Sequence, residues 1–454
     1  MYFFSVSPPL WIKVSDKTSE KELYFPSGYA IILPEYKRGE LYMKSIRDVF
    51  KIGKGPSSSH TMGPERAAKI FLNQNPQAAS FRVILYASLS KTGSGHGTDR
   101  VLYEVLGYDR TEVIFSDSTE PVPHPNTLDF YAYDAEGKEL ATMRVLSIGG
   151  GDIQIVGDEG KYEDTLSEET YPENSFAEIA QFCKWRYISL PEYVELNEGP
   201  EIWDFLAVIW ETMKAAIDRG IHTSGILPGG LQLERKAKNM YENIVPNERP
   251  QLMELRMICS FAYAVAEENA DNGVIVTAPT CGSAGVLPAV LRYMQLTHDL
   301  PDEKILEALA VAGLFGALVK RNASVSGAEC GCQAEIGTAC SMAAAALCET
   351  YNMELGQIEY AAEIAMEHQL GLTCDPICGL VQVPCIERNA VAAKRAMDAF
   401  NLSTLLTGTR NISFDMVVRT MKETGEHISD HFRETSEGGL ARLYHRRKRK
   451  VDHK

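Results

Sequence analysis

The sequence lacks an apolar stretch long enough to cross a membrane. Its most apolar run, Ala308 to Val319, has 12 residues, whereas a spanning helix needs about 20. We therefore expect a buried core helix there and no membrane partner. The N-terminal stretch MYFFSVSPPLWIKV also lacks the basic segment with which a signal peptide begins. We expect a cytoplasmic protein, in which a reducing environment leaves the ten cysteines without structural disulfides.

Positive charge is also scarce. Lys and Arg number 45 against 61 Asp and Glu, which gives a net charge of −16. This balance excludes a general nucleic-acid-binding protein, because phosphate contacts require a basic face. The one dense basic run, RLYHRRKRK at 442–450, is expected to be part of a solvated tail, 442–454. With 45% hydrophobic and 23% charged residues, the composition is that of an ordinary globular protein.

The spacing of structural zinc ligands is missing as well. No CxxC pair occurs with a second such pair or with a HxxxH partner, yet cysteines gather in one part of the chain. Seven of the ten lie within 56 residues: Cys330, Cys332, Cys340, Cys348, Cys374, Cys378 and Cys385. Any one of them could be a small buried hydrophobe, but so dense a set favours a soft-metal site. Widely spaced thiolates on loops beside helix ends suit an iron–sulfur cluster. Cys340 lies at the start of a predicted helix, where the helix dipole favours a thiolate.

The hydrophobic pattern changes along the chain and predicts an α+β fold. Alternating Phe81, Val83 and Leu85, with β-type runs at 112–115, 128–134 and 140–148, predicts an N-terminal α/β domain with a mixed sheet at 43–190. Residues 1–42 show no sustained period, and we interpret them as an appendage of the kind that a wrongly chosen start codon adds. The segment SLPEYVELNEGPE, 189–201, is expected to be a loop, with a linker at 191–201. Helical periods then predict an all-helical catalytic domain at 202–441. The first helical period runs through Trp203, Leu206, Trp210, Met213 and Ile217, and we expect Gly220 to be its C-terminal cap. Further helical periods occur at 251–268, 286–297, 303–320, 341–351, 355–369, 386–399 and 413–424. We expect no strand in this domain.

Four segments interrupt these periods with small and polar residues, as expected where backbone approaches a ligand. The first, KGPSSSHTMGP at 54–64, surrounds His60 with hydroxyls, although these serines could simply cap the next helix. The second, TAPTCGSAG at 277–285, offers hydroxyls and N–H groups before a helix and suits a carboxylate. The third and fourth carry the cysteines. His124 lies in a PHPN turn that it might merely stiffen, and TGSGHG at 92–97 matches no phosphate-loop pattern.

Together these segments resemble the bacterial iron–sulfur L-serine dehydratases of single-chain type. The similar stretches are GPSSSHTMGP, HPN, LPGGL, TAPTCGSAGVLPAVL, NASVSGAECGCQAEIGTACSMAAA, GLTCDPICGLVQVPCIERNA and ETSEGGLA, and they span roughly 43–441. The resemblance implies a β-type domain at 43–190 and an α-type domain at 202–441. It implies the conversion of L-serine to pyruvate and ammonia in amino-acid degradation and gluconeogenesis, in a homodimer.

The resemblance also implies a [4Fe-4S] cluster held by Cys340, Cys374 and Cys385, with one iron left for substrate. That iron would act as a Lewis acid on the β-hydroxyl. Substrate would be surrounded by Ser58, Ser59, Thr61, His124, Asn126, Thr280, Gly282, Ser283 and Gly285. His60 is our expected general base, with His124 as the alternative.

The sequence departs from the family at three points. Cys330 and Cys378 stand where an apolar and a small residue are expected, and no terminal cysteine follows ETSEGGLA to ligate the open iron. The nearest alternative function is a lyase acting on L-threonine or L-cysteine. An alternative of another class is a regulatory binding protein with a zinc-stabilised helical half. A pyridoxal-phosphate enzyme is disfavoured because no Lys-centred Schiff-base motif is evident.

Overall fold

The computed structural model describes residues 22–24, 30–32, 43–118, 120–157, 169–406 and 410–452. The chain forms two compact units, Met1–Tyr42 and Met43–Lys454. In the first unit, strands β1 (Glu22–Tyr24) and β2 (Ala30–Ile32) pair antiparallel. Most of the expected appendage lies outside the described residues. All elements below belong to the second unit.

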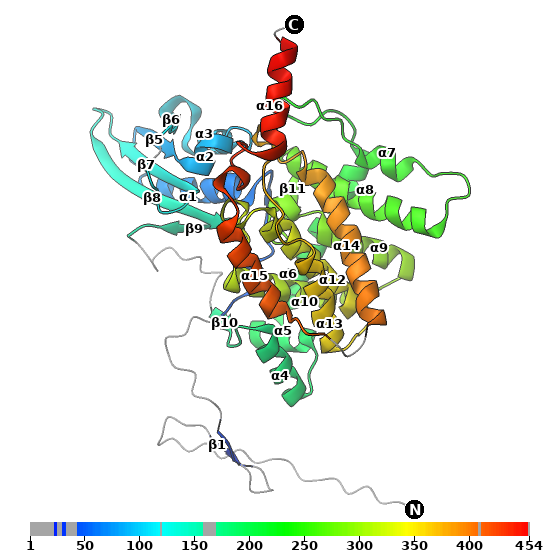
Figure 1. The fold of residues 1–454 in the computed structure, drawn as a ribbon. Coiled ribbons are helices and arrows are strands. Elements are labelled where there is room, and N and C mark those ends of the chain that lie inside the picture. Colours follow the sequence, from blue (N-terminus) through cyan, green and yellow to red (C-terminus); the bar gives the residue numbers. More distant parts are fainter. Residues whose placement is uncertain are drawn as a thin grey trace, which may run out of the picture. The chain divides into compact units, whose positions relative to one another are not determined.

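A five-stranded sheet follows the first helix of this unit (Figure 1). Its order is β6-β5-β7-β8-β9, and only β5 and β6 run parallel. The expected mixed sheet is therefore confirmed. The strands are β5 (Ser80–Leu85), β6 (Thr111–Phe115), β7 (Thr127–Tyr133), β8 (Glu139–Gly149) and β9 (Asp152–Ile155).

One face of the sheet is covered by three helices, α1 (Gly63–Gln74), α2 (Ala87–Thr92) and α3 (Thr98–Leu106). The alternating Phe81, Val83 and Leu85 of β5 point into this cluster, as the period of two predicts. These helices are short, and their apolar faces point toward the sheet. Their ends and the turns between them can therefore carry polar side chains toward the helical part.

The rest of the unit is helical and has its own hydrophobic core. Its helices are α4 (Phe176–Arg186), α5 (Leu190–Glu198), α6 (Glu201–His222), α7 (Ala237–Glu242), α8 (Pro250–Ala270), α9 (Val286–His298), α10 (Asp302–Asn322), α11 (Gly327–Cys330), α12 (Thr338–Thr350), α13 (Leu355–Glu367), α14 (Cys385–Leu405), α15 (Phe414–His427) and α16 (Gly439–Asp452). The basic run at 442–450, which we expected in a tail, therefore lies within α16. The expected α+β class is confirmed.

One fully buried helix and the long buried run of a second helix lie at the centre of the helical core. Every residue of α12 is buried, and so is the run Ala308 to Val319 of α10, as predicted. Small residues permit this close packing: a Cβ added at Gly313 would lie 2.9 Å from the Cβ of Ile46. The N-terminal residues Met43 to Phe50 are thereby held in the helical core.

Three local expectations are wrong. The predicted loop at 189–201 contains α5, which begins with a capping box between Ser189 and Glu192. A strand, β11 (Val274–Val276), occurs in the helical part and pairs antiparallel with β4 (Ile52–Lys54), because only three residues are needed for such a pairing. Gly220 does not cap α6 but lies inside it.

The physical reason for Gly220 is a close helix contact rather than a turn. A Cβ there would lie 2.4 Å from the carbonyl oxygen of Ala264 in α8, so only glycine lets α6 and α8 approach this closely. Among the described residues, no helix combines the length and apolarity that a bilayer crossing requires. The domain boundaries 43–190 and 202–441 stay predictions.

Candidate active site

The SSSHT segment forms a helical turn, Ser58–Met62, between β4 and α1. Ser57 caps this turn by accepting a hydrogen bond from the backbone N–H of His60 at 3.1 Å. The turn buries His60 completely. Burial, followed by the nearby His96, lowers the pKa of His60 well below its usual value, so the imidazole is neutral at pH 7 and one of its ring nitrogens carries no proton.

The hydrogen bonds of His60 define which ring nitrogen carries the proton. The Ser88 hydroxyl donates to the carbonyl oxygen of Glu434 and the Thr92 hydroxyl donates to that of Ser88, each at 2.9 Å. Both hydroxyl oxygens therefore accept from Nε2 of His60, which lies 3.2 and 3.0 Å away. Nδ1 is left without a proton, and it lies 3.1 Å from the Ser59 hydroxyl.

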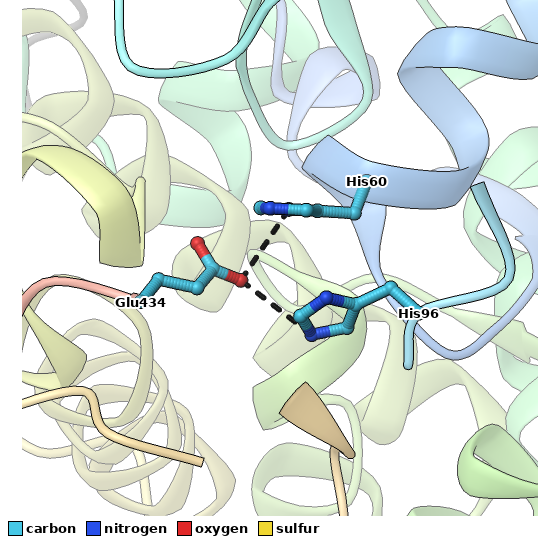
Figure 2. A group of neighbouring side chains, drawn as sticks. All are labelled: His60, His96 and Glu434. Atoms are coloured by element: carbon cyan, nitrogen blue, oxygen red, sulfur yellow. Dashed lines mark ion pairs between the residues drawn. The ribbon is translucent and has the colours of Figure 1, made fainter. Parts of the chain in front are cut away.

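Glu434 and His96 complete a buried group with His60 (Figure 2). The Glu434 carboxylate points between the two imidazoles, with Oε1 3.4 Å from Nδ1 of His60 and 3.8 Å from Nε2 of His96. Nδ1 of His96 donates to the carbonyl oxygen of Thr92 at 3.0 Å, so its Nε2 is bare. Burial lowers the pKa of His96 to about 4.

His124 is held in a different way. The backbone N–H of Asn126 donates to its Nδ1 at 3.0 Å, so Nε2 carries the proton and donates to Glu329 at 3.0 Å. The Ser324 hydroxyl also donates to Glu329. Burial by itself would raise the pKa of Glu329, but these hydrogen bonds lower it. Nδ1 of His124 thus accepts from a backbone N–H that is fixed in place, whereas Nδ1 of His60 faces the Ser59 hydroxyl, which can rotate away.

Three thiols meet in a small buried cavity beside this histidine group. Its lining comes from several distant segments: Pro56, Ser57, His96, Gly282, Cys332, Glu335, Cys374, Pro376, Val381, Cys385 and Glu434. Cys332 and Cys374 are hydrogen-bonded to each other, and both lie within 4.8 Å of a carboxylate oxygen of Glu335. The hydrogen bond from Cys374 and the nearby Arg388 stabilise the thiolate of Cys332 and lower its pKa.

Arg388 connects the three cysteine-bearing segments. It lies in the first turns of α14, which begins with Cys385. Its guanidinium donates to the carbonyl oxygen of Thr373, beside Cys374, at 2.7 Å, and it also hydrogen-bonds to Cys332. One cation thus contacts or adjoins all three thiols.

The ETSEGGLA segment reaches the cavity through a strand-like contact. The backbone N–H of Cys374 donates to Phe432, and that of Glu434 donates to the carbonyl oxygen of Cys374, each at 2.7 Å. This pairing places the Glu434 side chain between the thiols and the histidines. The site can therefore offer a bare imidazole nitrogen, three soft metal ligands and two buried carboxyl groups in one place.

Comparison with known proteins agrees with this arrangement. The family description "Serine dehydratase alpha chain" matches residues 133–441, and "Serine dehydratase beta chain" matches residues 45–113. The chain is 41% identical to an L-serine dehydratase of Streptomyces coelicolor, with 87% of this chain and 98% of that protein covered. It is 40% identical to an L-serine dehydratase of Haemophilus influenzae, with coverages of 88% and 99%.

The chain belongs to the serine dehydratase family. An Escherichia coli member, L-serine dehydratase 2, is 38% identical over 448 residues. The resemblance stated from the motifs is confirmed, and so is the expectation that the chain is an enzyme of this kind, a lyase.

Of the three cysteines expected to hold metal, the structure brings Cys374 and Cys385 to the cavity but not Cys340. The Cys340 thiol donates to the carbonyl oxygen of Ala392 at 3.3 Å, and burial raises its pKa to about 12. A helical turn, Gln333–Gly337, precedes α12 directly, and Cys332 is its N-terminal cap residue. The helical column thus begins at Cys332, and Cys340 lies two turns inside it. A helix start favours a thiolate, and in this continuous helical column the cysteine at the start is Cys332.

The residues expected around substrate fall into two sets. Gly282 lines the cavity, and the Ser59 hydroxyl contacts His60. Others hold the walls in place through internal hydrogen bonds: Thr61 donates to His96, Thr280 to Glu335, Ser283 to Ala278, and Gly285 to Asn389, while the Asn126 amide donates to Ser147. Ser58 is buried in the turn, and His124 bonds to Glu329.

Sequence reasoning missed several residues at the cavity. His96 lies in TGSGHG, which we considered only as a phosphate loop, and Glu434 lies in ETSEGGLA, which we used only as a similarity. Glu335 follows Cys332 by three residues, so the two share one turn of the helical column. Burial raises the pKa of Glu335 to about 8. Cys330 and Cys378 are not lining residues of the cavity. Cys330 packs against Gly425, where a Cβ would lie 2.6 Å from its sulfur.

Proposed function

We propose that this chain is an L-serine ammonia-lyase that converts L-serine to pyruvate and ammonia. The observation that carries the proposal is that three thiols line one buried cavity together with Glu434, and that the proton-free Nδ1 of His60 lies 3.4 Å from Oε1 of Glu434. The printed names of the relatives support L-serine as the substrate. L-Threonine and L-cysteine remain the alternatives, because each also carries a leaving group on its β-carbon.

The residues of the cavity fit an iron–sulfur cluster. Three cysteines, Cys332, Cys374 and Cys385, surround it, and thiolates are the ligands that iron–sulfur clusters require. Arg388 would balance part of the negative charge that such a buried site carries. We propose these three as the ligands of a [4Fe-4S] cluster, with Cys332 in the role that the family resemblance had suggested for Cys340. When bound, the cluster would supply a Lewis acid that assists departure of the β-hydroxyl.

We propose that His60 removes the α-proton through Nδ1. Its Nε2–H is fixed by the hydroxyl oxygens of Ser88 and Thr92, so the ring cannot present the protonated nitrogen to substrate. The resulting imidazolium keeps Nε2–H bonded to both hydroxyls, while the new Nδ1–H faces Ser59 and Glu434. The α-proton and the β-hydroxide leave as water, and the aminoacrylate tautomerises and hydrolyses to pyruvate and ammonia.

The function is tested with protein prepared without air. Iron, sulfide and zinc are measured, and pyruvate or the corresponding keto acid is followed with L-serine, L-threonine and L-cysteine. Equal iron and sulfide with preferred turnover of L-serine supports the proposal. Zinc without sulfide would favour the binding-protein alternative, and a preference for another amino acid would correct the substrate.

The role of His60 is tested with His60→Ala and a matched variant, His124→Ala. We expect His60→Ala to keep its iron and to lose roughly 10²- to 10⁴-fold in turnover, as for removal of a positioned base. His124→Ala should lose less, because both nitrogens of His124 are used in wall contacts. Near wild-type turnover of iron-replete His60→Ala, with a large loss in His124→Ala, would reverse the assignment.

A further inference from the structure

Within the described part of the chain, two hydrogen-bond acceptors in the cavity have no partner. They are Nε2 of His96 and Oε2 of Glu434. Both side chains are almost completely buried, with 1% and 6% exposure, and both line the same cavity as the thiols. Buried acceptors without partners are rare and cost free energy. Their presence in a cavity indicates a ligand that donates hydrogen bonds.

The hydrogen bonds around His96 fix its acceptor role. Nδ1 donates to Thr92, so Nε2 presents a lone pair, and it does so beside the Glu434 carboxylate (Figure 2). A hydroxyl group has one proton and would satisfy one of the two acceptors. An ammonium group has three N–H bonds and can satisfy both acceptors at once.

On the basis of the proposed function, we propose that His96 and Glu434 form the subsite for the α-ammonium group of the substrate. The rings of His96 and His60 lie 4.4 Å apart, centroid to centroid. An ammonium group held by His96 would therefore lie close to the ring that we propose as the base. The same contact makes the enzyme select amino acids over hydroxy acids and unsubstituted acids of the same size.

A metal ion is the competing occupant, because two histidines and a carboxylate are also a common ligand set. We favour ammonium because a metal at this position would take the lone pair of His60 Nδ1, and that lone pair is the base of the proposed reaction. The test below separates the two.

The test compares two ligands that differ only in the ammonium group. L-Serine has it, and 3-hydroxypropanoate keeps the carboxylate and the β-hydroxyl without it. The variants are His96→Leu, which removes the acceptor, and His96→Gln, which retains an amide oxygen. A third variant, Glu434→Gln, replaces the carboxyl group by a neutral amide of the same shape. His298→Leu, at the exposed end of α9, is the control. Each is prepared without air, and iron content and the L-serine-induced change in the iron spectrum are measured beside KM and kcat.

For His96→Leu we expect KM and the spectroscopic Kd for L-serine to rise roughly 10- to 100-fold, the effect of one lost hydrogen bond to a charged group. Inhibition by 3-hydroxypropanoate should change less than about threefold. His96→Gln should recover most of the affinity for L-serine. Glu434→Gln should weaken the binding of L-serine and not that of 3-hydroxypropanoate, and it serves as the test if His96→Leu cannot be purified.

Equal weakening of both ligands, or of neither, would overturn the subsite. A stoichiometric metal other than the cluster iron, lost in His96→Leu, would overturn it in favour of the metal site. Failure of the wild-type enzyme to convert L-serine would instead refute the proposed function. If the wild-type enzyme converts L-serine, but His96→Leu has the same ratio of affinities for L-serine and 3-hydroxypropanoate as wild type, the subsite alone is refuted.

Discussion

Replacing Cys332 and Cys340 by serine, one at a time, is the sharpest test of the proposed metal site. The two cysteines are eight positions apart in one helical column, but they contact different surroundings. Cys332 lies at the cavity with Cys374 and Arg388. Cys340 lies against Ala392 and Gln369, so the variants are matched in chemistry and differ in place.

The structure gives a magnitude for this difference. Eight positions along a helix correspond to about 12 Å, at ~1.5 Å per residue. That separation is several times the ~2.3 Å length of a metal–thiolate bond, and the Cys340 thiol donates to the carbonyl oxygen of Ala392 instead. A cluster held by Cys374 and Cys385 would therefore lie within reach of Cys332, which lines the same cavity, and not of Cys340.

The assay is iron and sulfide per chain after reconstitution without air, with thermal unfolding as the control for folding. We expect Cys332→Ser to lose the cluster, because serine oxygen is a poorer ligand for iron. Cys340→Ser should retain it, since a serine hydroxyl can also donate to the carbonyl oxygen of Ala392. The reasoning is refuted if Cys332→Ser binds a full complement of iron and sulfide, or if folded Cys340→Ser binds none.

Two further predictions concern charge. Arg388→Gln should bind less iron and release it faster to a chelator than wild type, because the cation near all three thiols is lost. The control is Arg395→Gln, seven positions further along α14, which should behave as wild type. Equal retention of iron in both variants would contradict this role of Arg388. The protein should lose stability on acidification from pH 6.5 toward 4, because unfolded His96 binds its proton near pH 6.5 and folded His96 only near pH 4. The free energy of unfolding thus rises with pH in this range, and His96 accounts for about 2 kcal/mol of the loss at pH 5. The measurement is unfolding of wild type and His96→Gln at several pH values. Equal dependence on pH in both proteins would exclude this contribution.

The helices were predictable because each long one carries a repeated apolar face. The period of α6 predicted its face correctly, but the same pattern could not show that Gly220 faces Ala264 across a helix contact. The segment of α5 was missed because its Pro and Glu residues suggested a loop, although Pro is favoured in a first turn and the capping box was present. β11 was missed because its partner β4 lies more than 200 residues earlier, and three residues carry no period.

The site was predictable in its segments but not in its contacts. His60 was identified from the hydroxyl-rich turn that surrounds it, whereas the choice between His60 and His124 required the hydrogen bonds that fix each ring. The assignment of Cys340 came from the family resemblance and was supported by its place at an expected helix start, and the period does not reveal the extra turn Gln333–Gly337 that precedes α12. His96 and Glu434 approach each other only in the fold, because 338 positions separate them in the chain.

The backbone of Glu434 connects the thiol loop to His60, the proposed base. Its N–H donates to the carbonyl oxygen of Cys374, and its own carbonyl oxygen accepts from the Ser88 hydroxyl, whose oxygen accepts from Nε2 of His60. A shift of the Cys374 loop would therefore move the carbonyl oxygen of Glu434, which accepts the Ser88 proton. Such a shift would also change which ring nitrogen of His60 carries its proton. Because each link is a single hydrogen bond between elements from both ends of the chain, neither the sheet part nor the helical part alone contains a base in the correct tautomer. The position of the thiols and the readiness of the base are thus properties of one hydrogen-bonded chain.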